Sequence, residues 1–479
     1  MIPINKDQVL AANASLDSQS LPADLLTLLA AAAEANPQGK CAEFSFSAQQ
    51  AEIVRSHSYQ SAYELALKTA ALLKNLQGTQ SGNIALLIPP IPEALPIALG
   101  AISVGDIWLL SPMLDESLVS QALEKHGVGV LITVAAYPDL GTWNYAESFI
   151  ESVSSLTHIL QIDLVQYLGR FKRMTTYFSL RRGGKAEKRD DQIMGDLFKT
   201  LESIEAPKYE TLSPGAGEGR VWSPYLDAHG HLGWKPWTQQ LLIKTTYLLD
   251  QLLPKSESQL VLHAQMWEQA DLWIAGGLLP LLRRQSLVSL GPNGWAGMDL
   301  SRDLPVLKSL GLHLWVSGRA EMGGFLGESH AASEVAKQWI CLDGIADGTL
   351  IQEMTQAGVQ VFEWLVDHAE PHAGTLLQGG GSRCELSAQT MNPSSGHALE
   401  LIAQAHPDIW LAAAIHDADS DKWLLYLQRH PGSELDLPAI NDWIRSQLAG
   451  TDTPAPSGYR VVEPMPVGLG GEVDYQAFQ

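Results

Sequence analysis

Helical and strand-forming patterns alternate at short spacing between residues 59 and 133. Short apolar runs, each long enough for one strand, alternate with segments whose apolar residues recur at steps of three and four. The helical segments are 59–77, 92–104 and 118–126, and the apolar runs are 83–88, 107–110 and 128–133. Because a strand that is apolar throughout is buried on both faces, this alternation predicts a parallel α/β sheet with helices covering it.

The rest of the chain continues the α/β pattern until a break near residue 378. Further helical segments lie at 20–36 and 237–253, and further strand-like runs at 260–263, 286–290, 312–317, 338–341 and 360–364. After the glycine-rich sequence LLQGGGS (376–382) comes a compact segment with strands near 409–415, 423–427 and 459–462 and a helix over 437–448. We therefore expect a large N-terminal α/β domain over 1–378 and a small C-terminal α+β domain over 379–479.

Charge and cysteine content exclude several classes of protein. The formal net charge is -22 over 479 residues, so we expect no nucleic-acid partner, because phosphate contacts need a basic surface. Cys41, Cys341 and Cys384 form no CxxC or His/Cys cluster, which argues against a disulfide framework or a zinc site. Prolines interrupt the longest apolar stretch (84–113), and the N-terminus has no signal-peptide pattern, so we expect a cytoplasmic protein.

One basic stretch stands out in this acidic chain. Residues 170–189 read RFKRMTTYFSLRRGGKAEKR and also contain aromatic residues. Two interpretations are open: a solvated surface helix with a Gly183-Gly184 turn, or a peripheral contact for an anionic lipid surface or an acidic partner. The aromatic residues do not decide between them.

Three separate stretches carry short motifs in a characteristic order. The first, 61–115, contains GNIALL, Pro92-Glu93 and a Leu-Gly-Ala triplet, and the second, 270–290 with 312–318, contains GGLLPLL. The third is the tail, with HPD at 406–408, VVEPMP at 461–466 and GGEVDY at 470–475. Together they resemble the adenylate-forming superfamily of acyl-CoA synthetases, luciferases and nonribosomal adenylation domains. The resemblance implies a large N-terminal and a small C-terminal domain.

The phosphate-binding loop that the resemblance implies falls in WSPYLDAHGHLG (222–233). Such a loop needs small residues, whose backbone N–H groups approach phosphate, and a lysine. Its candidate residues here, all in a degenerate context, are Ser223, Asp227, Gly230 and Gly233. Pro224 removes an N–H donor and Asp227 repels phosphate, while Lys235 and Lys244 lie nearby outside the expected motif. We expect no nucleotide binding by this loop.

Three other parts of the implied nucleotide site also depart from the family pattern. No aromatic-Gly-x-Thr-Glu motif follows the strand near 360–364, and Glu370 is explained as a surface carboxylate more simply than as a displaced remnant of the motif. A hinge-like sequence with Gly381, Arg383 and Glu385 follows almost at once, so the ribose-binding segment is missing. Glu472 occupies the position expected for the C-terminal lysine, which inverts the charge needed beside a phosphate oxygen. We therefore assign no catalytic residue.

Other chemistries have weaker signals. The chain has neither a GxSxG nucleophile elbow before a helix nor a GxGxxG after its first strand. The pairs His229/His231 and His368/His372 are explained by surface loops more simply than by a metal site, so no metal is expected. Four tryptophans either line a ligand pocket or fill a core, and these are Trp222, Trp234, Trp237 and Trp267.

These observations leave three hypotheses for the function. The first is a non-catalytic pseudoenzyme that binds an acyl group, an acyl carrier or an enzyme partner in fatty-acid or natural-product biosynthesis, with no cofactor. The second is a divergent AMP-forming acid–thiol ligase, which requires ATP and magnesium. The third is a structural subunit of a biosynthetic complex. The first is favoured by the missing nucleotide motifs.

Overall fold

A computed structural model of the 479-residue chain gives the fold. The residues that it describes are 15–16, 20–47, 50–77, 82–111, 114–135, 142–167, 192–212, 219–226, 232–253, 260–263, 270, 273–290, 314–318, 338–342, 360–366, 373–378, 382–387, 399–400, 402–403, 406, 408–417, 422–429, 435–448, 454–463, 465–466 and 478. The chain divides into two compact units: Ser18–Tyr225 with Leu232–His313, and Met1–Asp17 with Leu226–His231 and Leu314–Gln479.

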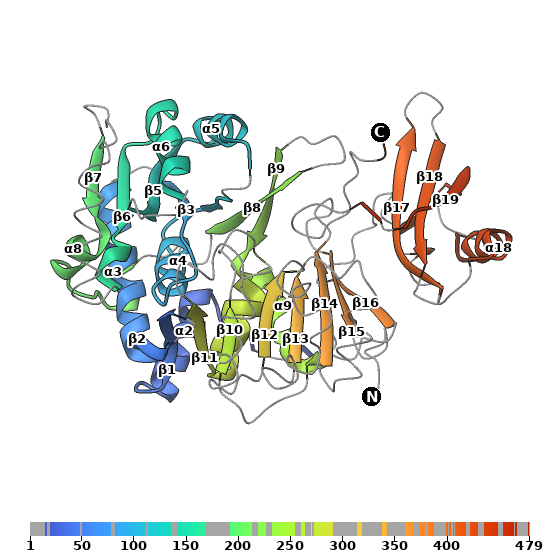
Figure 1. Ribbon diagram of the computed structural model, residues 1–479. Coiled ribbons are helices and arrows are strands. Elements are labelled where there is room, and N and C mark those ends of the chain that lie inside the picture. The colour runs from blue at the N-terminus through green and yellow to red at the C-terminus, as the bar shows by residue number, and fades with distance from the viewer. Residues whose placement is uncertain are drawn as a thin grey trace. The chain divides into compact units, whose positions relative to one another are not determined.

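The first unit contains a sheet with seven described strands in the order β7-β6-β5-β3-β4-β8-β9 (Figure 1). The strands are β3 (Asn83–Leu87), β4 (Ile107–Leu109), β5 (Val128–Val134), β6 (His158–Ile162), β7 (Ile193–Asp196), β8 (Arg220–Leu226) and β9 (Leu232–Thr238). Strands β3 to β8 pair in parallel. The parallel α/β sheet predicted from the sequence is therefore confirmed. Strand β9 is an edge strand joined to its neighbour β8 by five residues, a connection that only antiparallel neighbours can make.

Helices cover both faces of this sheet. Helices α5 (Glu116–Lys125) and α6 (Thr142–Ser152) pack on the face that carries Ala85, Leu87 and Leu131. Alternate residues of β3 point to the other face and are equally buried. Helix α3 (Tyr59–Gln77) packs against α4 (Ala94–Ile102) and α8 (Leu197–Glu202). Because both faces of the sheet are buried, the sequences of its central strands are continuous apolar runs.

Side-chain caps mark where several of the helices begin. The Asp115 carboxylate accepts hydrogen bonds from the backbone N–H groups of Ser117 and Leu118 at the start of α5. Asp24 caps α2 (Leu25–Ala35) in the same way, and Thr238 caps α9 (Gln239–Leu252). No helix among the described residues is long and apolar enough to cross a membrane.

A second group of strands in the first unit follows the order β10-β11-β1-β2. These are β1 (Lys40–Ser47), β2 (Gln50–Ser58), β10 (Leu260–His263) and β11 (Ser286–Leu290). Strand β1 pairs in parallel with β11 and antiparallel with β2. A π-helical turn, η3 (Trp273–Leu278), runs into α11 (Leu279–Arg283) and is buried throughout.

The second unit contains two groups of strands. Strands β12 (Leu314–Gly318), β13 (Gln338–Leu342) and β14 (Gln360–Val366) are parallel, and β15 (Ala373–Gln378) and β16 (Ser382–Ser387) extend them as antiparallel neighbours. Strands β17 (Ile409–Asp417), β18 (Lys422–Arg429) and β19 (Gly458–Val461) form a separate sheet, which packs with α18 (Leu437–Leu448) around one apolar cluster. The small C-terminal α+β segment is thus present, while its boundary at 378/379 stays a prediction.

Candidate functional site at one edge of the parallel sheet

The carboxyl ends of the parallel strands meet at one edge of the seven-stranded sheet. Glu93 lies in the segment after β3, Tyr167 lies in η1 (Leu164–Tyr167) after β6, and residues 227–231 follow β8. Strands β3 and β8 are separated only by β4, which places their ends about 10 Å apart. Ligands of open α/β sheets bind at this edge, where the strand order reverses. Here the reversal occurs at β3, which has β4 on one side and β5 on the other.

Two of the predicted loop residues lie in the strands that flank residues 227–231. Ser223 belongs to β8 and Gly233 to β9. The Ser223 hydroxyl accepts a hydrogen bond from the backbone N–H of Ala270 at 2.9 Å, so it already has a structural partner. Asp227 and Gly230 lie outside the described residues. Whether this loop holds a nucleotide is not tested by these positions.

An aromatic cluster shows which face of the sheet the side chains of β8 and β9 occupy. The Trp222 ring stacks on Trp108 with centroids 4.9 Å apart, and the Trp234 ring meets Trp108 edge-on, also at 4.9 Å. These tryptophans therefore pack in the core, as one of the two interpretations of them predicts. Because side chains alternate along a strand, Ser223, Gly233 and Lys235 lie on the opposite face.

Lys235 is a buried cation on the strand that follows the loop. Its side chain belongs to a residue that is only 3% exposed, and its ammonium lies 4.8 Å from the centroid of the Trp237 ring. The Trp237 indole Nε1 is buried and has no hydrogen-bond partner among the described residues. Burial strengthens the attraction between this ammonium and the aromatic face.

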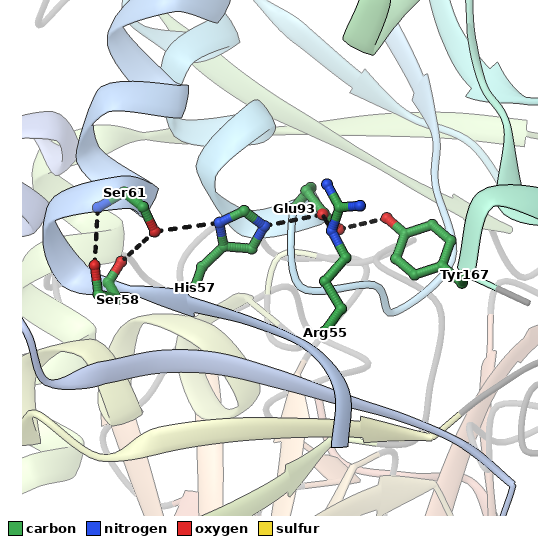
Figure 2. A network of polar contacts seen from close by, with 6 residues as sticks. All are labelled: Arg55, His57, Ser58, Ser61, Glu93 and Tyr167. Carbon is green, nitrogen blue, oxygen red and sulfur yellow. Dashed lines mark hydrogen bonds and ion pairs between the residues drawn. The ribbon is translucent and has the colours of Figure 1, made fainter. Parts of the chain in front are cut away.

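A second polar cluster surrounds Glu93 at the same edge (Figure 2). The Glu93 side chain is fully buried, and Arg55 Nε forms an ion pair with its Oε1. His57 Nε2 lies 2.9 Å from Oε1, and the Tyr167 hydroxyl donates to Oε2 at 2.6 Å. The Arg55 guanidinium also lies over the Tyr167 ring, 5.0 Å from its centroid. Residues from β2, η1 and the start of α4 are thereby joined through one carboxylate.

These contacts set the protonation of the two acidic groups. Burial by itself raises the pKa of Glu93, but the hydrogen bond from His57 and the Arg55 charge outweigh it, and the pKa is lower than usual. Burial and the neighbouring Glu93 charge raise the pKa of Tyr167 well above its ordinary value. Glu93 is therefore a carboxylate and Tyr167 a phenol at neutral pH.

Sequence reasoning did not identify this cluster as a site. Glu93 was noted only as part of a Pro-Glu motif, and Arg55, His57 and Tyr167 were not singled out. The available signal was the position of Glu93 within the apolar run IPPIPEALPIALG, because a lone carboxylate in a buried segment needs charged partners. The partners lie 38, 36 and 74 residues away, so the sequence did not reveal them.

Comparison with solved structures identifies the fold. No protein-family model matches the chain, and no curated protein matches it. The acetoacetyl-CoA synthetase from Streptomyces lividans superimposes with a TM-score of 0.57 at 14% identity, covering 94% of this chain and 80% of that chain. An anthranilate CoA ligase in complex with anthranoyl-AMP gives 0.55 at 13% identity and covers 96% of this chain and 98% of that chain. The chain has the fold of the AMP-dependent, adenylate-forming ligases.

A third structure with the adenylate-forming fold supports the same assignment. The O-succinylbenzoate coenzyme A synthetase from Bacillus subtilis in complex with AMP gives a TM-score of 0.53 at 11% identity, covering 94% of this chain and 98% of that chain. The resemblance inferred from the three sequence stretches is therefore confirmed at the level of the fold. The α/β fold class, with a large N-terminal and a smaller C-terminal part, is confirmed with it.

The remaining predicted positions in this adenylate-forming fold are only partly described. Arg383 and Glu385 lie in β16, paired with Leu377 and Thr375 of β15, while Gly381 lies outside the described residues. Their hinge role stays a prediction. Glu370, Glu472, Trp267 and the basic stretch 170–189 also lie outside the described residues, as do the two histidine pairs. Within the described ranges, no cluster of His, Cys, Asp and Glu is suited to hold a metal ion.

Proposed function

We propose that the protein is a divergent acid–thiol ligase of the acyl-CoA synthetase type, which activates a carboxylic acid with ATP. The observation that carries the proposal is the likeness over nearly the whole chain to ligases bound to AMP or to an acyl adenylate. Strands of both the N-terminal part and the C-terminal sheet of this fold are present among the described residues. Because a fold alone does not establish an activity, the site must supply further support.

That support comes from the segment after β8. Lys235, in β9, is the basic residue nearest to this segment in sequence among those described. The Lys235 ammonium and the unused Trp237 N–H are donors suited to a phosphate oxygen. Lys235 thus takes the part of the phosphate-binding cation in this proposal. No described residue is assigned as a magnesium ligand.

A second candidate function rests on a separate observation. Glu472 stands where the resemblance implies a lysine, and Asp227 lies within the candidate phosphate loop. Each carboxylate repels a phosphate, which favours a non-catalytic protein that binds an acyl group, an acyl carrier or an enzyme partner in a lipid or natural-product pathway. A structural subunit of a biosynthetic complex is the third option, and a cytoplasmic location stays a proposal for all three.

Pyrophosphate exchange tests acid activation. The purified full-length chain is incubated with Mg-ATP, labelled pyrophosphate and carboxylic acids of increasing chain length, beside an active acyl-CoA synthetase. The ligase proposal predicts acid-dependent exchange of label into ATP. Lys235→Ala should lower the exchange rate about 100-fold, as loss of one preorganised donor does elsewhere.

The control variant is Lys199→Ala, which removes an exposed lysine of α8 and should leave exchange unchanged. Absence of exchange with every acid, while the control synthetase exchanges, would reject the ligase proposal. Binding of an acyl chain without exchange would then support the non-catalytic candidate. If the protein neither catalyses exchange nor binds an acyl chain, the structural-subunit hypothesis would remain.

A further inference from the structure

Ser61, His57 and Glu93 form a continuous hydrogen-bonded row at the edge of the parallel sheet (Figure 2). The Ser61 hydroxyl lies 3.2 Å from His57 Nδ1, and His57 Nε2 lies 2.9 Å from Glu93 Oε1. The imidazole therefore bridges a hydroxyl and a carboxylate through its two nitrogens. None of these three residues takes part in the proposed ligase chemistry.

The order of these groups determines the tautomer of the imidazole. The Glu93 oxygens are acceptors, so in the neutral ring the Nε2–H donates to Glu93 and Nδ1 is left as the acceptor facing Ser61. This is the protonation pattern in which a histidine removes the proton from a serine hydroxyl while a carboxylate holds the ring and stabilises the imidazolium. Glu93 remains ionised for this role because Arg55, His57 and Tyr167 all stabilise its charge.

The carboxylate of the row is more buried than the other two groups. The Glu93 side chain is fully buried, and the His57 side chain is 16% exposed. Ser61 is half-buried in the first turn of α3. The carboxylate is thus shielded from water, while His57 and Ser61 are only partly buried, an arrangement compatible with nucleophilic catalysis.

The same turn limits what this site can do. The single Ser61 O–H hydrogen has two competing acceptors, the Ser58 carbonyl at 3.1 Å and His57 Nδ1 at 3.2 Å, so the hydroxyl must turn from the carbonyl to the imidazole before it is activated. The backbone N–H of Ser61 donates to the Ser58 hydroxyl at 3.2 Å. The N–H groups of Tyr59 and Gln60 are bonded to the carbonyls of Gly39 and Pro37. These first-turn donors are therefore unavailable to an oxyanion. Loss of one such donor slows acyl transfer about 100-fold to 1000-fold, so only activated acyl groups should react.

We propose that Ser61 is a nucleophile for activated acyl esters and thioesters, with His57 as its base and Glu93 as the residue that orients His57. Ser61 Oγ forms a bond to the acyl carbonyl carbon, and its proton passes to His57 Nδ1. The bond to the leaving alcohol or thiol breaks, and the leaving group takes that proton. Water then cleaves the acyl-serine, which releases the carboxylic acid and restores the Ser61 hydroxyl. The reaction consumes neither ATP nor an oxidant.

A fluorophosphonate probe tests this site on the full-length protein without nucleotide. We expect the probe to modify Ser61, located by fragmentation of the tryptic peptide from Ser56 to Lys68. With p-nitrophenyl acetate we expect a burst of about one nitrophenolate per chain followed by slow turnover, since nitrophenolate is a better leaving group than the serine alkoxide that deacylation must expel. Ser61→Ala should remove both signals, and His57→Gln should reduce both at least tenfold.

Ser56→Ala is the matched control, because Ser56 is an exposed serine in the same peptide. It should leave the labelling and the burst unchanged. Labelling that does not reach Ser61, or that persists in a folded His57→Gln variant, would overturn the proposal. If His57→Gln fails to fold, the Ser61→Ala result decides alone. Because the assay contains no ATP, its outcome is independent of the pyrophosphate-exchange result.

Discussion

Glu93 shows how much of one site can depend on a single buried carboxylate. Its two oxygens accept contacts from Arg55, His57 and Tyr167, which come from segments far apart in the sequence. A buried charge of this kind is tolerated because it is paired, and removing one partner leaves the others without compensation. The sequence indicated the need for partners but not their identity, because the partners are brought together only by tertiary packing.

Glu93→Gln should destabilise the protein by about 3 kcal/mol at pH 7, the typical loss when one member of a buried pair is removed. Because the pKa of Glu93 is lowered by folding, its contribution to stability is present above its unfolded pKa and is lost as the pH falls through the folded value. Urea unfolding from pH 7 down to acid should therefore show a smaller pH dependence in the variant. Equal stability of the wild-type protein and Glu93→Gln at pH 7 would contradict the stabilising role assigned to the Glu93 contacts.

Tyr167→Phe isolates one hydrogen bond of the same network. The variant keeps the ring, which lies under the Arg55 guanidinium and meets Phe44 edge-to-face, and removes only the hydroxyl that donates to Glu93. Hydrogen bonds to charged groups contribute about 2 kcal/mol, so a loss of that size is expected in urea unfolding. Tyr63→Phe is the control, since Tyr63 is only partly buried and lies outside the network. A loss no greater than that of the control would contradict the assigned hydrogen bond.

At the level of elements, the sequence predicts the helices whose apolar residues recur at helical spacing along their whole length. Helix α3 runs over 59–77 and α18 over 437–448, as their apolar spacing indicates. The sequence analysis instead places a phosphate-binding loop over 222–233 and begins a helix at 237, whereas these residues lie largely in β8 and β9, which contain Pro224 and Pro236 although proline is unusual in strands. Pro236 is tolerated because β9 is an edge strand, and Pro224 lies beyond the two residues of β8 that pair with β4. Both prolines are thus tolerated because of where they lie in the sheet, and the local sequence carries no information about that position.

The packing of α3 on α4 makes a prediction of its own. A Cβ at Gly100 would lie 2.3 Å from the backbone carbonyl oxygen of Ala66, so α4 must move away from α3 to admit one. Gly100→Ala should therefore destabilise the protein by about 2 kcal/mol through overpacking. Gly129→Ala is the matched control, because its Cβ would meet nothing closer than 3.9 Å. Equal unfolding midpoints for the two variants would contradict the close contact.

At the level of the whole molecule, fold and activity rest on different kinds of observation. The order of the α/β units and the C-terminal segment was readable from three sequence stretches, and the superpositions confirm the fold. The proposed nucleotide site could not be predicted in the same way, because its proposed cation, Lys235, lies in a strand that the sequence analysis did not predict. Its burial and its unused neighbour at Trp237 became visible only in the structure.

A calorimetric titration of the full-length protein with Mg-ATP tests the central claim most directly, beside an active acyl-CoA synthetase. The ligase account predicts saturable binding that weakens at least tenfold in Lys235→Ala and is unchanged in Lys199→Ala. Absence of heat at ATP concentrations that saturate the control synthetase would contradict the account, and the fold would then serve a function without nucleotide.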